Sequence, residues 1–417
     1  MYRKLMFSTA ISCFSLTATA APFMAMDPRS LGMGGTGVSA ATSAGAVFYN
    51  PALLAAAKAD EDFSLEIPTL TLRVADPDKL RDSVSDISDK DPFQKFSTAL
   101  DAFNTPTTNP TIFNQRKTNL FNASTDMRNA LVSISDRTVE AGGNFGVVVG
   151  IPSKRFGSSF MANYWAAGGA YGEVSGVDLK AIDDSIAAVQ SQDITSLLTQ
   201  NDITQNFTSF VALRAATFLE IGLGFGREFE LAGHTFAGGI TPKFVQVQTY
   251  DYKYVAKELD TADLTSQQGE KKYGSFNIDL GVAKDYGTAW KTGFAIKNLI
   301  PQTYETGAKN QIKVGPQARI GASRHTDRTT LAFDLDLNPT DPVGFGGKTQ
   351  YLGIGGEVDV WVLLLRLGYR YNIADSASSI ATVGLGLDLL GLHLDISAGA
   401  SPDVGEVNAA AQLGFRF

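Results

Sequence analysis

Two aspartates, Asp334 and Asp336, are the residues whose types and spacing best suit chemistry. Residues two apart on a β-strand share a face, so these carboxylates could act as a general acid and a general base. The alternative is that they are like charges on the inner wall of a closed sheet, neutralised by nearby Arg319, Arg366 or Arg370. We favour a charge network. Charged side chains that face the interior of a closed sheet form ion pairs between strands, and these pairs hold in place a segment of the chain that fills the interior.

The remaining reactive side chains do not form a recognisable site. His234, His325 and His393 are too far apart for a metal-ligand spacing, and the single cysteine, Cys13, cannot join them. The sequence contains neither a Gly-x-Ser-x-Gly elbow nor a phosphate-binding loop of the Walker type. We therefore expect no catalytic residue, no metal and no cofactor, and we predict that the protein is not an enzyme.

Composition favours one large β-structure over the two or three soluble domains that 417 residues could also form. Glycine is plentiful at 41 residues, and charged residues make up only 19%, below the usual quarter. A net charge of −8 without a basic stripe argues against nucleic acid as a partner. No apolar run reaches the roughly 18 residues of a membrane-spanning helix, whereas the strands of a membrane barrel alternate their apolar residues.

Several segments alternate apolar and polar residues with a period of two. In residues 330–338, Leu331 and Phe333 share one face, and Asp334 and Asp336 share the other. Segments 276–282, 363–370 and 382–389 follow the same rule. Their polar face combines glycine with scattered charge, as a crowded barrel interior does, so the apolar face would meet lipid. The sequence therefore predicts an all-β fold, an antiparallel β-barrel of an outer membrane.

The connections between these segments alternate between long and short, as they do in bacterial barrels, and they imply about fourteen strands. This count holds if residues 205–230 form one long strand. Two long connections, 76–142 and 176–202, carry apolar residues at helical spacing, which predicts helical insertions among the external loops. We interpret their apolar stripes as packing faces. Both chain ends then fall on the periplasmic side.

Residues 1–20 have the features of a signal peptide. Arg3 and Lys4 precede an apolar segment, 5–16, and small residues at 18–20 provide a cleavage site before Ala21. Lipidation of Cys13 is an alternative, but the residues before it lack the usual leucine and a sufficient apolar length. We expect export, an N-terminal hatch or plug over residues 21–60, and the barrel over residues 61–417.

A glycine-rich run followed by an Asn-Pro turn marks the predicted hatch. Glycine loses too much backbone entropy for a regular element and suits a chain that folds back in a confined space. Asn50 is expected to satisfy buried backbone groups beside Pro51, which has no N–H. The candidate ligand or gate residues are Gly32, Gly34, Gly35, Gly37, Phe48, Asn50 and Pro51.

This stretch, and the barrel pattern after it, resemble the FadL/TodX superfamily of outer-membrane transporters for hydrophobic compounds. Within it, the likeness is greatest to barrel proteins named conjugal transfer protein TraF. The resemblance implies passage of hydrophobic small molecules across a Gram-negative outer membrane. A ligand would bind near the external loops, and movement of the hatch around Asn50-Pro51 would open a path. The TraF name implies an alternative, a structural or docking protein of the cell envelope whose helical insertions contact partners.

The last residues place apolar side chains at every second position and end in Phe415 and Phe417. This pattern resembles the C-terminal signal that the barrel-assembly machinery reads. The alternative is a soluble edge strand that happens to end in phenylalanine. We expect three kinds of partner, namely the assembly machinery, outer-membrane lipid and a hydrophobic small-molecule ligand.

Overall fold

The computed structural model describes residues 19–20, 23–55, 62–191, 202–259, 269–374, 379–401 and 405–416. The predicted signal peptide, except Thr19 and Ala20, lies outside these residues, and so does Phe417 of the predicted assembly signal. None of the described helices is long and apolar enough to cross a membrane.

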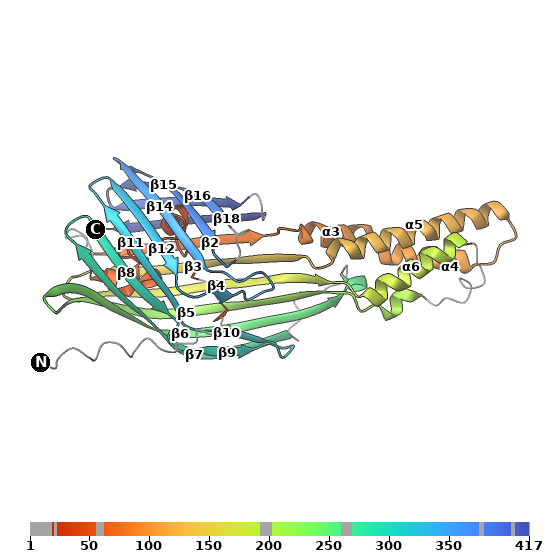
Figure 1. Cartoon of the computed structure of the whole chain (residues 1–417), viewed down its shortest axis with the longest axis horizontal. Helices are drawn as coiled ribbons and strands as arrows, with labels where there is room; N and C mark the ends of the chain where they lie inside the picture. Colours follow the sequence, from red (N-terminus) through yellow and green to blue (C-terminus); the bar gives the residue numbers. More distant parts are fainter. Residues whose placement is uncertain are drawn as a thin grey trace, which may run out of the picture.

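Fourteen antiparallel strands close into one barrel, which confirms the predicted fold class and strand number (Figure 1). Neighbours in sequence are neighbours in the wall, and the last strand pairs with the first to close it. The strands are β2 (Ser64–Ala75), β3 (Thr138–Ile151), β4 (Gly157–Glu173), β5 (Phe210–Leu231), β6 (His234–Val255), β7 (Glu270–Tyr286), β8 (Trp290–Lys297), β11 (Gln317–His325), β12 (Thr329–Asp336), β14 (Tyr351–Val360), β15 (Leu363–Asn372), β16 (Ile380–Leu389), β17 (Leu392–Ser401) and β18 (Glu406–Arg416).

The two faces of each strand differ as the alternation predicts. On β12, Leu331 is 57% exposed, whereas Asp334 is only 1% exposed. On β15, Leu367 is 67% exposed and its neighbour Arg366 is 5% exposed. Apolar side chains therefore cover the outside of the barrel, and the charged ones face its lumen.

The barrel wall is uneven in height. Strands β5 and β6 contain 22 residues each, whereas β8 and β12 contain 8 each. At about 3.3 Å per residue, the long strands extend roughly 45 Å further along their own direction. Figure 1 shows them running toward the helices, so one sector of the wall projects well beyond the other.

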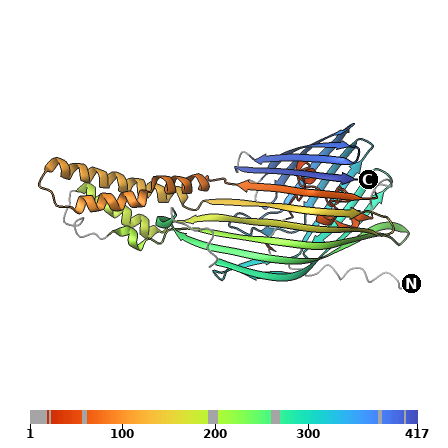
Figure 2. The same ribbon diagram turned by 180° about the vertical axis from the view of Figure 1, so that it is seen from behind.

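A helical arm continues from the long strands beyond the end of the barrel (Figures 1 and 2). It comprises α3 (Leu80–Lys90), α4 (Pro92–Asn104), α5 (Pro110–Ile134), α6 (Gly176–Ser191) and the short helix η2 (Ile203–Asn206). Its own hydrophobic core includes Phe96, Leu120, Leu131 and Ile182. The first helical segment ends before residue 142, because residues 140–143 pair with both β2 and β4 in the barrel wall.

A small hairpin lies against the lumen side of the long strands. It is formed by β9 (Gln302–Glu305) and β10 (Gln311–Val314), between the barrel strands β8 and β11. Its side chains Tyr304 and Ile312 belong to a buried apolar cluster with Trp165 and Phe218 of the wall. Three further short elements are η3 (Ala256–Glu258), β13 (Thr340–Asp341) and β1 (Thr19–Ala20), which pairs with β13.

Candidate functional site

Residues 23–55, which we call the hatch, fill part of the lumen. They form α1 (Pro28–Gly32), α2 (Ala46–Tyr49) and the short helix η1 (Pro51–Leu54), and each of them is buried or half-buried. The Asp27 carboxylate caps α1 by accepting the Ser30 N–H at 2.8 Å. Burial raises the pKa of Asp27, although hydrogen bonds from Ser30 and Tyr49 oppose the shift.

The predicted hatch glycines lie where a side chain lacks room or where the backbone has a positive φ. Gly34 has a positive φ of 70°, and a Cβ on it would lie 2.6 Å from backbone oxygens of β14 and β15. Gly35 also has a positive φ, of 83°. A Cβ on Gly37 would lie 2.6 Å from the Tyr49 ring, and one on Gly32 would lie 3.1 Å from Gly384 of the wall. The hatch backbone therefore touches the barrel wall directly.

Asn50 connects the hatch to itself and to the wall. It is fully buried, and its side-chain amide donates to the carbonyls of Val38 at 2.8 Å and Val282 at 3.2 Å. Its Oδ1 accepts the Ala52 N–H at 3.1 Å and caps η1, whose first residue is Pro51. The wall leaves space for this contact at Gly281, where a Cβ would lie 1.9 Å from Oδ1.

The neighbouring residues of the turn make wall contacts too. The Phe48 carbonyl accepts a hydrogen bond from Lys297 Nζ of β8 at 3.0 Å. Pro51 packs against Gly239 of β6, where a Cβ would lie 2.2 Å from the Pro51 carbonyl carbon. All seven candidate hatch residues thus lie at the interface between the hatch and the wall, where a role as ligand or gate residues remains a proposal.

The carboxylates Asp334 and Asp336 both bind partners in the lumen. Asp334 Oδ2 accepts the backbone N–H groups of Gly37 and Val38 at 2.8 and 2.9 Å, so it holds the hatch. Asp336 accepts from Arg319 Nε at 2.5 Å. The same guanidinium donates to two hatch carbonyls, those of Phe23 and Gly35, each at 3.0 Å. This arrangement matches a charge network that restrains the hatch.

The other two predicted arginines lie in the same lumen but have different partners. The β14–β15 register places Arg366 opposite Glu357, and Arg366 pairs with Glu357 at 2.7 Å and with Asp395. Arg370 pairs with Glu406 at 3.3 Å. Neither is paired with Asp334, which binds the hatch, or with Asp336, which binds Arg319 and accepts the Tyr351 N–H at 2.8 Å.

Sequence reasoning missed several charged residues of this lumen. Arg29 of the hatch forms a two-point ion pair with Glu357, at 2.8 and 3.0 Å. On the far wall, Lys243 is buried between Glu220 at 3.2 Å and Asp279 at 3.0 Å. The alternating pattern assigns the strand residues to the lumen face, but only the strand register identifies their partners.

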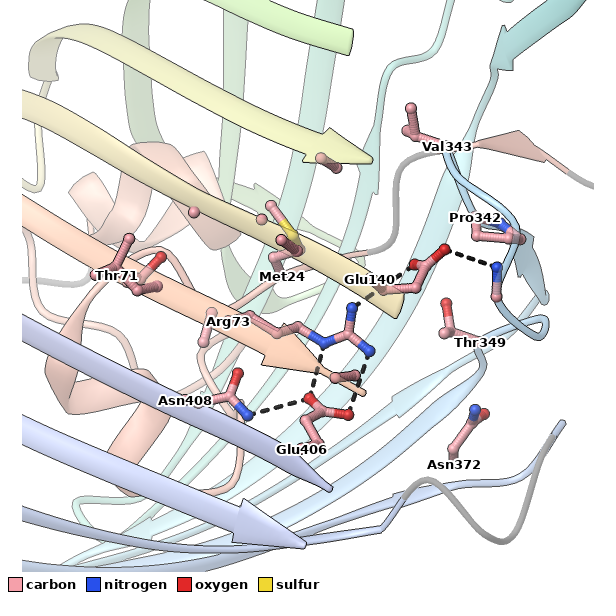
Figure 3. A pocket seen from close by; sticks show the side chains of 18 of the residues that line it. Met24, Thr71, Arg73, Glu140, Pro342, Val343, Thr349, Asn372, Glu406 and Asn408 are labelled. Atoms are coloured by element: carbon pink, nitrogen blue, oxygen red, sulfur yellow. Dashed lines mark hydrogen bonds and ion pairs between the residues drawn. The ribbon is translucent and has the colours of Figure 1, made fainter. Parts of the chain in front are cut away.

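A cavity of ≈ 180 Å³ lies between the hatch and the loop after β12 (Figure 3). It opens at the arm end of the short strands, where β2 ends and β18 begins. Hatch residues Met24 and Leu31 line one side, and Pro342 and Val343 of the loop line another. The polar lining includes Thr71, Arg73, Glu140, Tyr351, Arg370, Asn372, Glu406 and Asn408.

The loop after β12 is fixed over this cavity. Glu140 Oε1 accepts the N–H groups of Phe345 and Gly346 at 2.9 and 2.6 Å. The guanidinium of Arg214 lies 4.9 Å from the centre of the Phe345 ring. The hatch, this loop and the β9–β10 hairpin therefore all occupy the lumen, and Met24 of the hatch packs against the cluster that contains Tyr304 and Ile312 of the hairpin.

Phe415, the described residue of the predicted assembly signal, lies on the outer face of β18. Its side chain is 37% exposed, and its residue pairs with Leu392 of β17. It thus belongs to the apolar outer surface of the barrel. Recognition by the assembly machinery stays a prediction.

The whole architecture matches solved structures of one class of membrane protein. A TodX deltaS2S3 mutant, a monoaromatic hydrocarbon channel, aligns with a TM-score of 0.54 and 11% identity, over 94% of this chain and 99% of that one. The Ralstonia pickettii toluene transporter TbuX aligns with a TM-score of 0.50 and 12% identity, over 94% and 98%. A Pseudomonas aeruginosa FadL homologue aligns with a TM-score of 0.50 and 10% identity, over 96% and 99%. The chain thus has the fold of the FadL/TodX-type outer-membrane β-barrels.

The sequence identifies the family more narrowly. Residues 47–336 match the family described as F plasmid transfer operon, TraF, protein, and the chain belongs to that family. The matched range runs from α2 of the hatch to the end of β12. No curated protein matches the chain.

Proposed function

We propose that this protein lets small hydrophobic molecules pass across the outer membrane, with the hatch as its gate. The observation that carries the proposal is the hatch itself, which lies in the lumen and makes polar contacts with the wall, directly beside a cavity. The fold is similar to that of proteins named as a monoaromatic hydrocarbon channel and a toluene transporter. In this proposal residues 1–20 direct export, residues 21–60 form the gate, and residues 61–417 form the barrel.

The route begins at the arm end of the barrel, which we assign to the cell exterior because the opposite connections are short. A ligand enters the cavity beside Met24 and Leu31 and contacts the hatch there. Movement of the hatch around Asn50-Pro51 then opens a path. The charged lumen is a poor medium for an apolar molecule, because covering charged groups with an apolar molecule carries a desolvation cost.

A lateral exit through the wall would avoid that polar lumen. Strand β2 has a register shift between Glu66 and Thr69 against β3, and its pairing with β18 shifts at the same level. Pro68 lies inside this irregular stretch and offers no N–H to either neighbour. We therefore place the exit at this weakened part of the wall.

An uptake assay tests the proposed function. A strain that lacks the gene should take up radiolabelled toluene more slowly at low external concentration, and the wild-type chain should restore the rate. A barrel with the same expression and heat stability but no effect on uptake would contradict the proposal.

A second candidate function, docking in the cell envelope, is favoured by the helical arm. The arm has its own hydrophobic core and projects beyond the barrel, where it is accessible to a partner (Figure 2). Replacing residues 79–136 by a short linker preserves β2 and β3. If docking is the function, this change abolishes partner capture in crosslinked cells and leaves toluene uptake unchanged.

A further inference from the structure

One gap in the cavity's polar network has the geometry of a hydrogen-bonding site. Arg73 NH1 and Glu140 Oε2 face each other at 3.9 Å, too far for a direct hydrogen bond (Figure 3). A single oxygen atom placed between them can lie within about 2.8 Å of both. Among the described residues, neither atom has a hydrogen-bond partner.

Most of the rest of this network is already satisfied, although the buried Nε of Arg370 has no hydrogen-bond partner among the described residues. Glu406 accepts from Arg73 Nε at 2.7 Å, from Arg73 NH2 at 3.2 Å and from Arg370 at 3.3 Å. Asn408 donates to the same carboxylate at 3.0 Å. Glu140 Oε1 is occupied by the two loop N–H groups. The cavity therefore offers one donor, from Arg73, and one acceptor, from Glu140, side by side.

We propose that the cavity selects a small apolar molecule that carries one hydroxyl group, such as a phenol or a short alcohol. A hydroxyl both accepts and donates a hydrogen bond, so it satisfies Arg73 and Glu140 together. The apolar body of the ligand contacts Met24, Leu31 and Val343. This inference rests on the proposed function, because it defines the substrate class of the same route.

Other ligand classes fit less well. A plain hydrocarbon would cover Arg73 and Glu140 without pairing them, which carries a desolvation cost. A carboxylate would approach two carboxylates, those of Glu140 and Glu406, whose pairing with arginine leaves no net positive charge. A volume of ≈ 180 Å³ corresponds to about six water molecules and lies below the size of pockets for drug-sized ligands. The site therefore suits a single ring or a short chain.

Three probes of matched shape test this inference by calorimetry on the full-length protein in detergent. They are p-cresol, toluene and p-toluate, which carry a hydroxyl, no polar group and a carboxylate. We expect p-cresol to bind at least about tenfold more tightly than the other two, the effect of one or two added hydrogen bonds. Glu140→Gln should remove most of this preference, because it replaces the acceptor by an amide.

The control variant is Glu228→Gln, which replaces a carboxylate at the short-turn end of β5. It should keep the preference for p-cresol. Equal or tighter binding of toluene, or an unchanged preference in Glu140→Gln, would overturn the inference while leaving passage of hydrocarbons intact. Failure of all three probes to bind would count against the proposed function as well.

Discussion

The Asn50→Ala substitution separates the stability of the hatch from that of the barrel. Asn50 makes three hydrogen bonds, two as donor to the Val38 and Val282 carbonyls and one as acceptor from Ala52. At about 1 kcal/mol net for each buried hydrogen bond, the change should cost about 3 kcal/mol of the stability of the docked, folded hatch. That corresponds to an increase of roughly a hundredfold in the population with a locally unfolded hatch. Strand pairing does not involve Asn50, so the barrel should remain intact.

Hydrogen exchange read by mass spectrometry measures this effect. Peptides from residues 23–55 should exchange faster in Asn50→Ala, whereas peptides from β5 and β6 should be unchanged. The heat-modifiable band on a detergent gel should also persist. In cells, a looser hatch should increase leakage of large antibiotics.

The chain contains a matched control for this experiment. Asn109, followed by Pro110, caps α5 in the arm just as Asn50 caps η1, and it accepts the Thr111 N–H at 2.9 Å. Asn109→Ala should cost about 0.5–2 kcal/mol in the arm only. Unchanged exchange of residues 23–55 in Asn50→Ala, or an equal effect of Asn109→Ala on them, would refute the reasoning.

Three further predictions concern the wall, the last strand and the arm. Gly281→Ala should loosen the hatch like Asn50→Ala in the same exchange experiment, because its Cβ would lie 1.9 Å from Asn50 Oδ1. Phe417→Ser, or deletion of residues 415–417, should lower the fraction of heat-modifiable protein. The assembly machinery would no longer recognise the last strand, and each large apolar side chain no longer buried costs about 2–3 kcal/mol. Normal membrane insertion of both variants would contradict this prediction. Partial burial disfavours ionised Asp202, but hydrogen bonds from Thr204 and Ser97 outweigh it and lower its pKa. A carboxylate with a lowered pKa stabilises the folded state at pH values above its pKa in the unfolded chain, which is near 4. This contribution is lost as the pH falls below that value through the lowered pKa of the folded state. The melting temperature of the arm, followed by the helical circular-dichroism signal, should therefore fall in acid. The fall should be smaller in Asp202→Asn.

The sequence predicted the barrel well because the alternation is a local property. Leu331 and Asp334 differ in exposure because they occupy opposite faces of one strand, and any strand assignment implies this. The role of Asn50 as a partner of buried backbone groups also followed locally, since an Asn-Pro pair caps a following helical turn.

The pairings inside the lumen did not follow from the sequence. Arg366 meets Glu357 only because of the β14–β15 register, which a single strand does not specify. Arg29 and Glu357 are 328 positions apart, and no local pattern connects them. The β9–β10 hairpin has strands of four residues each, too short to show a clear period.

The central claim is that the hatch must move for a hydrophobic molecule to pass. Ser323 Oγ of β11 donates to the Ser39 carbonyl of the hatch at 3.0 Å, so the two residues are neighbours across the interface between hatch and wall, and the double substitution Ser39→Cys and Ser323→Cys tests for a disulfide between them. Toluene uptake should be measured in cells with this variant oxidised and then reduced. If the hatch must move, oxidation abolishes uptake and reduction restores it. Equal uptake in the two states, with the disulfide confirmed by mass spectrometry, would contradict it.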